Sequence, residues 1–199
     1  MSRIPLSALF IFMSTIASAQ CDGWQQLINC SIAVDLDHRT HRFTGNEKLV
    51  YQNNSPDRLD VLFFHLYFNA FKPGSEMDVR SRTIADPDRR VLDRIVSLSP
   101  GEQGDLRVGR IAQDGAACTL EPLGTILKVT LAKPIPPGKS AMLDLDFTGQ
   151  VPVQVRRSGR DNMEGISYSM SQWYPKVAAY DRRGWHAEPY VAREFYGEF

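Results

Sequence analysis

The side chains that most often carry out chemistry in proteins are few in this 199-residue chain, which contains four histidines and three cysteines. No histidine is followed by glutamate and no two histidines stand four residues apart, so the zinc-binding pattern His-Glu-x-x-His is absent. His38 and His41 stand beside a predicted turn, where solvated side chains are usual. His65 lies in an apolar stretch, and we expect a buried core histidine there rather than a ligand. The histidines therefore predict no self-sufficient catalytic centre.

Two pairs of aspartates are the other arrangement with possible chemistry. Asp35 with Asp37, and Asp144 with Asp146, each stand two residues apart in an alternating stretch, so each pair projects from one strand face. Such carboxylates bind Ca²⁺ when a further oxygen ligand converges on them. A polar stripe facing solvent explains both pairs more simply, and we predict no metal site and no cofactor in this chain.

Composition narrows the class of protein. Hydrophobic residues make up 43% of the chain and charged residues 23%, which excludes wholesale disorder, collagen and coiled coil. Lysine and arginine together number 23, equal to aspartate and glutamate, so no net field attracts nucleic acid or an anionic membrane. We expect neither a nucleic acid nor, once any leader is removed, a membrane as partner.

Residues 1–19 have the pattern of a cleaved signal peptide. A basic start at Met1–Arg3 precedes the apolar run Ile4–Ile16 and the small-residue ending Ala17–Ala19. The run is shorter than the roughly 20 residues that a spanning helix needs, so an uncleaved anchor is the lesser alternative. Cleavage after Ala19 would leave residues 20–199 as one β-rich domain in a secreted or periplasmic protein.

Export would place all three cysteines in an oxidising compartment. The nine-residue separation of Cys21 and Cys30 permits a small disulfide loop near the mature terminus, which leaves Cys118 over. Three unpaired thiols, with Cys118 buried, are the alternative. Lipidation of Cys21 is disfavoured because Gln20 precedes it.

Alternation of apolar and polar residues is the strongest structural signal and predicts an all-β, antiparallel sheet or sandwich. The clearest strands are residues 31–37, 127–131 and 141–148. The stretch 59–67 is apolar on both faces, which predicts a central strand covered on both sides. Residues 78–93 are charged and poorly periodic, and they predict a surface loop or a short helix.

Turn-forming residues separate these strands. We predict reversals at Thr44–Asn46, Asn53–Pro56, Pro100–Gly101 and Pro136–Gly138, where glycine, proline or asparagine supplies the required backbone conformation.

Nine of the twenty aromatic residues lie within residues 168–199. Rings of this size usually seal a core, and the alternative is that they form the wall of a binding cleft. Alternation over residues 191–199 predicts a final strand.

A series of short motifs follows one another in a characteristic order. They include Phe64-His-Leu-Tyr-Phe-Asn-Ala-Phe71 and Ser171-Gln-Trp-Tyr-Pro175, and the full set is Ile32–Asp37, Phe43–Gly45, Leu49–Pro56, Leu59–Phe71, Pro136–Gly149, Ser171–Pro175, Tyr180–Asp181, Gly184–Trp185 and Glu194–Tyr196. In this order the motifs resemble the N-terminal domain of the aminopeptidase N-like zinc metallopeptidases, the gluzincin family, in its bacterial secreted branch.

This resemblance implies an all-β, saddle-like domain that packs on a thermolysin-like helical domain and lines its peptide-binding cleft. In such enzymes the helical domain carries the zinc ligands, so the resemblance implies that the chain is truncated before a catalytic domain and inactive alone. Its partners would be that missing domain and a peptide substrate, with zinc as the cofactor of the missing domain.

One site residue follows from the resemblance. The family's first domain lends a Gln or Glu to the pocket for the substrate's amino terminus, and Gln172 is the residue that matches. An amide that satisfies backbone groups near a strand end is the structural alternative. At the level of the whole chain, the alternative function is a self-standing secreted β-sandwich that binds a peptide, a glycan or a protein.

Overall fold

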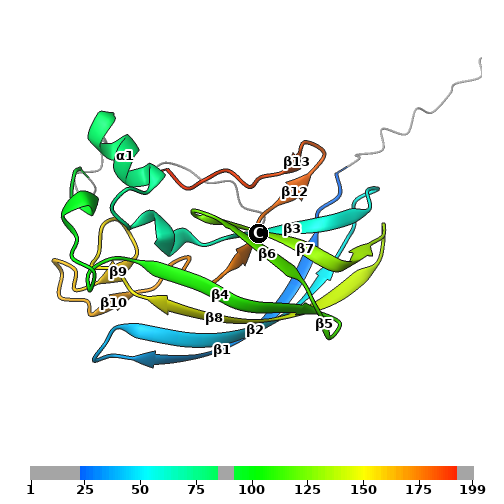
Figure 1. The fold of residues 1–199 in the computed structure, drawn as a ribbon, viewed down its shortest axis with the longest axis horizontal. Helices are drawn as coiled ribbons and strands as arrows, with labels where there is room; N and C mark the ends of the chain where they lie inside the picture. Colours follow the sequence, from blue (N-terminus) through cyan, green and yellow to red (C-terminus); the bar gives the residue numbers. More distant parts are fainter. Residues whose placement is uncertain (1–22, 85–91, 192–199) are drawn as a thin grey trace, which may run out of the picture.

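The computed structural model describes residues 23–84 and 92–191, which form two antiparallel β-sheets packed against each other (Figure 1). The prediction of an all-β antiparallel architecture is confirmed. The predicted signal peptide, the Cys21 partner of a possible disulfide and the strand predicted beyond Val191 lie outside the described residues. Among the described residues, Cys30 and Cys118 form no disulfide.

The first sheet has five strands in the order β1-β2-β8-β4-β5. Their bounds are β1 Leu27–Asp37, β2 Arg42–Gln52, β8 Ser140–Gln150, β4 Asp105–Gln113 and β5 Ala116–Ala117. The second sheet has the order β11-β3-β7-β6. Its strands are β11 Lys176–Val177, β3 Leu59–His65, β7 Ile126–Ile135 and β6 Thr119–Leu123.

Short elements complete the described chain. Two small ribbons pair β9 with β10 and β12 with β13, and they are formed by Gly159–Arg160, Tyr168–Ser169, Tyr180–Asp181 and Gly184–Trp185. The helical elements are η1 Tyr67–Ala70, α1 Glu76–Thr83 and η2 Ile95–Ser97. Within residues 23–84 and 92–191, no helix is both long and apolar enough to cross a membrane.

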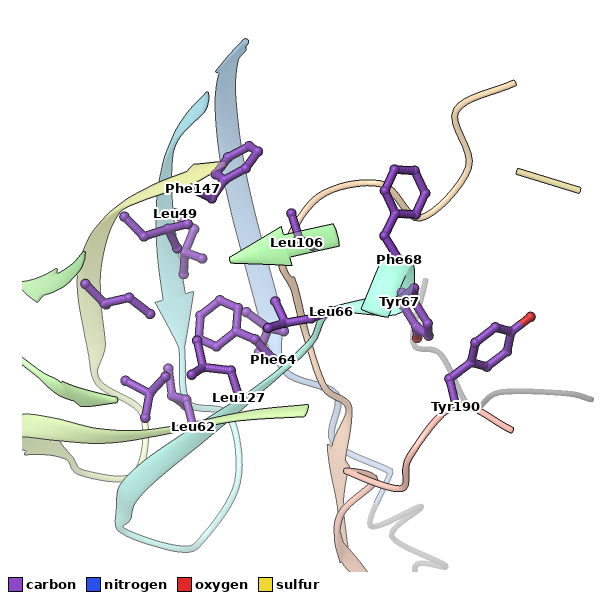
Figure 2. Packing of buried hydrophobic residues seen from close by; sticks show 14 of the residues in the cluster. Leu49, Leu62, Phe64, Leu66, Tyr67, Phe68, Leu106, Leu127, Phe147 and Tyr190 are labelled. Atoms are coloured by element: carbon purple, nitrogen blue, oxygen red, sulfur yellow. The ribbon is translucent and has the colours of Figure 1, made fainter. Parts of the chain in front are cut away.

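The core lies between the two sheets. It is built from the alternate residues of the longer strands whose side chains face the opposite sheet. In β2 the buried residues are the odd-numbered ones, among them Leu49 and Tyr51, because alternate side chains of a strand point to opposite faces. Figure 2 shows Leu49 and Phe147 of the first sheet on one side of this core, and Leu62 and Leu127 of the second sheet on the other. The three alternating strands predicted from sequence all lie within β1, β7 and β8.

The apolar stretch 59–67 forms β3 and then enters η1. β3 lies between β11 and β7, and each residue from Val61 to His65 is buried or half-buried. The prediction of a central strand covered on both faces is confirmed.

The turns predicted at 53–56, 100–101 and 136–138 are confirmed, but the turn predicted at Thr44–Asn46 is wrong. Those residues lie inside β2, and the chain reverses at residues 38–41 instead, where His41 has a φ of +57°. Gly45 is required for packing, because a Cβ there would lie 2.3 Å from Cζ of Phe147, its cross-strand partner.

The charged segment after η1 contains α1, so the alternative of a short helix is confirmed for its first part. The Ser75 hydroxyl accepts a hydrogen bond from the Asp78 N–H at 3.1 Å and caps the helix. The Asp78 carboxylate is fully buried, and it accepts hydrogen bonds from the Gly74 N–H at 2.8 Å and from the Arg82 guanidinium. These contacts fix a helix whose own residues are mostly polar.

Candidate functional site

Gln172 lies in the segment that connects β10 to β11. Its φ is +56°, in the left-handed region, which costs a residue with a Cβ about 1–2 kcal/mol. Strained residues of this kind persist where the surrounding structure fixes them, often at functional sites. The side chain is half-buried and forms no hydrogen bond with a described residue. Its contact with a substrate stays a prediction.

The residues on either side of Gln172 hold this conformation. The Ser171 N–H donates a hydrogen bond to the Ser158 hydroxyl at 3.1 Å. The Trp173 ring packs edge-on against Phe43, with centroids 5.7 Å apart and planes at 83°, and lies 6.1 Å from the Phe147 ring. Gln172 is therefore anchored between a hydrogen bond and an aromatic contact with the core.

The aromatic residues of the C-terminal third mostly seal the core. Partly buried rings pack against it from Tyr168, Trp173, Tyr174, Tyr180 and Trp185, and Tyr190 is itself buried. One ring, that of Tyr174, also lines a cavity. This is the kind of role that the alternative of a binding-cleft wall predicts for these aromatic residues.

That cavity has a volume of about 160 Å³ and lies between the first strands of one sheet and the edge strand β11 of the other. Six polar side chains line it, from Cys30, Glu47, His65, Tyr67, Tyr174 and Lys176, together with Ile28 and residues 177–179. Sequence analysis did not select this cluster, since its members come from four separate segments of the chain.

Glu47 is the most unusual member. It occupies an inward-facing position of β2, its side chain is 2% exposed, and its Oε2 atom has no hydrogen-bond partner in the described part of the chain. Burial raises the pKa of the Glu47 carboxyl to about 8. A signal for it was present in the sequence: Glu47 shares the parity of Phe43, Leu49 and Tyr51 in an alternating strand.

His65 is buried, as predicted, with 5% of its surface exposed. Its ring stacks on Tyr67 with centroids 4.9 Å apart, and neither ring nitrogen has a hydrogen-bond partner of normal geometry among the described residues. Burial lowers the pKa of His65 to about 4, so the imidazole is neutral at physiological pH.

The other cavity groups are also neutral. Burial, followed by the nearby Glu47 carboxyl, raises the pKa of the Cys30 thiol. Burial likewise raises the pKa of the Tyr67 and Tyr174 hydroxyls. The cavity therefore contains polar groups held in their uncharged forms, with the Lys176 ammonium group at its margin.

The side chains of the remaining histidines do not line this cavity. His38 is exposed in the turn between β1 and β2, as expected, whereas His41 is half-buried with its Nδ1 2.6 Å from the Tyr168 hydroxyl. His186 lies 3.0 Å from the Asp181 carboxylate. His186 is nevertheless close to His65, because its backbone makes a hydrogen-bonding contact with the His65 ring, outside normal geometry, and its N–H donates to the Ala179 carbonyl at 2.9 Å.

Three of the four paired aspartates, Asp37, Asp144 and Asp146, have protein partners. The Asn46 amide donates to Asp144 at 2.9 Å and to Asp146 at 3.0 Å, and the Arg110 guanidinium contacts both carboxylates. Asp37 accepts hydrogen bonds from the turn that follows it. In residues 23–84 and 92–191, no group of three or more His, Cys, Asp or Glu side chains is arranged to hold a metal ion.

The face of the first sheet that contains the core extends beyond it. Val34, Gly45, Phe147 and Val108 are successive register partners across β1, β2, β8 and β4, and they line a broad groove of about 830 Å³. Val34 belongs to the core-facing parity of β1 and is nevertheless 49% exposed. Val34 is thus exposed at the β1 end of this row, whereas Phe147 is buried and packs against Trp173.

Comparisons with known proteins gave structural matches alone. No family model matches the chain, and no curated protein matches its sequence. A mutant of a two-domain M1 zinc metallopeptidase bound to L-arginine shares 16% identity with a TM-score of 0.45, over 75% of this chain and 27% of that one. An M1 zinc metallopeptidase from Deinococcus radiodurans gives 16% identity and a TM-score of 0.45, over 74% and 26%.

The chain is similar in fold to part of these M1 zinc metallopeptidases. It spans about a quarter of the length of the structures it matches. A mutant of the Deinococcus radiodurans enzyme bound to Tyr-Ser-Ala matches at 17% identity with a TM-score of 0.44, over 75% of this chain and 27% of that one.

Proposed function

We propose that this chain is the non-catalytic β-domain of an exported aminopeptidase N-like zinc metallopeptidase, in which it supports the catalytic domain and lines the peptide cleft. Gln172 would contact the amino terminus of the bound peptide. The order of the sequence motifs supports the family, and the backbone and surroundings of Gln172 support the contact.

The geometry of Gln172 is the observation that carries the proposal. A left-handed backbone at a glutamine is unfavourable, and the Ser171 and Trp173 contacts hold it in place. The amide oxygen of an unpartnered glutamine accepts hydrogen bonds from an ammonium group, which is the group that marks the amino end of a peptide. A fixed, half-buried acceptor of this kind suits the recognition of a chain terminus.

The exposure of Val34 supports the structural part of the proposal. Val34 lies on the core-facing side of the first sheet and is 49% exposed. Apolar surface in this position is stabilised when a further domain covers it. The catalytic domain is the occupant that we propose.

The described residues do not fit a zinc ion, and the sequence lacks His-Glu-x-x-His. The proposal therefore places the metal and the hydrolytic step in the catalytic domain, and it assigns this chain positioning and recognition alone.

Binding of a peptide to the 199-residue chain tests the role of Gln172. We expect the side-chain amide signals of Gln172 in a ¹⁵N NMR spectrum to shift on addition of trialanine, and to remain unchanged with N-acetylated trialanine, which lacks the ammonium group. Gln172→Glu adds a negative charge and is expected to tighten binding several-fold, whereas Gln172→Ala abolishes it.

Gln25→Ala serves as the matched control, because Gln25 is an exposed glutamine outside this segment. Equal shifts with the free and the acetylated peptide would contradict the proposal, and so would trialanine binding that is unchanged in Gln172→Ala.

A further inference from the structure

The cavity of about 160 Å³ beside Tyr174 is distinct from the Gln172 position, and the proposed function does not use it. It lies where the open edge of the sandwich brings the inward face of β1 and β2 against β11 and the end of β3. Residues from both sheets thus meet around one small space.

Two of its lining groups are buried side chains with hydrogen-bonding atoms that the described residues leave unsatisfied. Glu47 Oε2 is enclosed and forms no hydrogen bond with a described residue. The His65 ring has only a backbone contact from His186 outside normal hydrogen-bond geometry. Leaving such groups unpaired costs each of them about 1–3 kcal/mol, and natural structures rarely retain them without a role.

We propose that this cavity binds a small organic cation that carries N–H donors, of the guanidinium or primary ammonium type, between Glu47 and His65. Glu47 supplies the negative charge and an acceptor oxygen. The unprotonated nitrogen of His65 supplies the second acceptor, and the Tyr67 and Tyr174 rings supply the aromatic surfaces on which guanidinium and ammonium groups pack.

The size of the cavity limits the ligand. One water molecule takes about 30 Å³ of liquid volume, so the space corresponds to roughly five waters. A methylguanidinium or methylammonium ion fits this space, and an entire peptide does not.

The charge of the cavity depends on the titratable residues that line it. Cys30, His65, Tyr67 and Tyr174 are neutral at physiological pH for the reasons given above, and they add no competing charge. Lys176 lines the cavity, and Lys176 and Glu188 act on His65 with opposite signs. The carboxyl of Glu47 is thus the group whose ionisation decides whether a cation is held.

Ligand binding is expected to draw a proton from Glu47, because a cation stabilises the carboxylate form. With the Glu47 pKa at about 8, the ionised fraction rises about tenfold between pH 7 and pH 9. Methylguanidinium stays charged over this range, so its affinity is expected to rise by about the same factor.

The test uses the full 199-residue chain and methylguanidinium chloride at millimolar concentrations. Alkylation of Cys30 by iodoacetamide is followed by mass spectrometry, since the Cys30 thiol lines the cavity. We expect methylguanidinium to slow the alkylation of Cys30 at least severalfold without slowing that of Cys118. Urea, which has a similar shape but no charge, and acetate are expected to give no protection.

Glu47→Gln keeps the size of the side chain and removes its charge, and we expect it to abolish protection. His65→Gln is expected to weaken it severalfold. Glu121→Gln is the matched control, because Glu121 is an exposed glutamate on β6 that pairs with Lys128. A rise in affinity from pH 7 to pH 9 in the wild-type chain, lost in Glu47→Gln, supports the proposal.

Absence of protection in the wild-type chain overturns the proposal, as does protection that persists unchanged in Glu47→Gln. Protection by acetate in place of methylguanidinium overturns it as well, and identifies Lys176 as the group that sets the chemistry of the cavity. Each of these results leaves the trialanine experiment on Gln172 unaffected, so the two proposals fail separately.

Discussion

The ring of Phe147 lies over Gly45, the residue opposite it on the neighbouring strand, and the ring of Phe43 lies over Gly149 in the same way. The two rings meet edge to face at 6.2 Å, and Trp173 packs against both. Each phenylalanine is therefore opposite a glycine on the neighbouring strand. This arrangement leaves room for two large rings to be buried side by side between β2 and β8.

We expect Gly45→Ala to lower the free energy of unfolding by about 1–3 kcal/mol, the usual cost of overfilling a packed core. The added Cβ would lie 2.3 Å from Phe147 Cζ, and this ring is held by Phe43 and Trp173. Urea unfolding followed by tryptophan fluorescence measures the change.

Gly109→Ala is the control for that substitution. Gly109 lies in β4 of the same sheet, and a Cβ there would meet no atom closer than the Asp146 carbonyl oxygen at 3.9 Å. Little loss of stability is expected. Equal losses in the two variants would show that glycine matters for the backbone at both positions, and that the Phe147 ring does not determine the effect.

Gln172→Gly is expected to leave the free energy of unfolding unchanged or to raise it by up to about 1 kcal/mol. Glycine removes the steric cost of the left-handed backbone, which offsets the entropy it adds to the unfolded chain. Gln52→Gly, at the end of β2, is expected to cost about 1 kcal/mol instead, because its backbone is extended. A substantial loss on Gln172→Gly would mean that the side chain itself stabilises the fold.

Glu47 makes the folded state less stable as the pH rises. Its folded pKa of about 8 lies above the ordinary 4.5, so its favourable contribution is fully present below pH 4.5 and is lost as the pH approaches 8. At about 1.4 kcal/mol per pH unit, roughly 2 kcal/mol is expected to be lost between pH 6.5 and pH 8. Chemical unfolding at several pH values should show this slope in the wild-type chain and a nearly flat profile in Glu47→Gln.

His65 acts in the opposite direction. Its folded pKa of about 4 lies below the ordinary 6.5, so its contribution is present above pH 6.5 and is lost as the pH falls to 4. Between pH 4.5 and pH 6.5 the two slopes nearly cancel in the wild-type chain. We expect His65→Gln to keep gaining stability as the pH falls through this window, while His38→Gln, at an exposed position, follows the wild-type profile. Identical profiles for the two variants would contradict this assignment.

Much of the fold follows from local patterns. Alternation at residues 127–131 and 141–148 indicated strands because each has one buried face, and at residues 31–37 because Ile32 and Leu36 share a half-buried face. The two-sided apolar stretch 59–67 indicated the central β3. Gly45 was misinterpreted because a glycine that accommodates a ring from another strand has the same local appearance as a glycine in a turn. The distinction depends on Phe147, more than a hundred residues away in the sequence.

The candidate sites were less predictable for the same reason. Gln172 was selected through a motif, but its backbone conformation depends on contacts with Ser158 and Phe43. Glu47 stood at a core position of an alternating strand, and the sequence alone did not indicate that His65 and Tyr174 would converge with it. Sequence patterns determine which side faces inward, and only the tertiary packing determines which inward residues meet.

In the described part of the chain, β1 pairs with β2 alone, so one side of its eleven-residue backbone is open to a further strand. Its last residues carry Asp35 and Asp37, whose charges oppose the approach of another strand. The half from Leu27 to Ala33 has no charged residue and includes the exposed Ile28. Intermolecular strand addition, and any aggregation of the isolated chain, would therefore begin at this uncharged half of the edge, where a single lysine substitution offers the simplest protection.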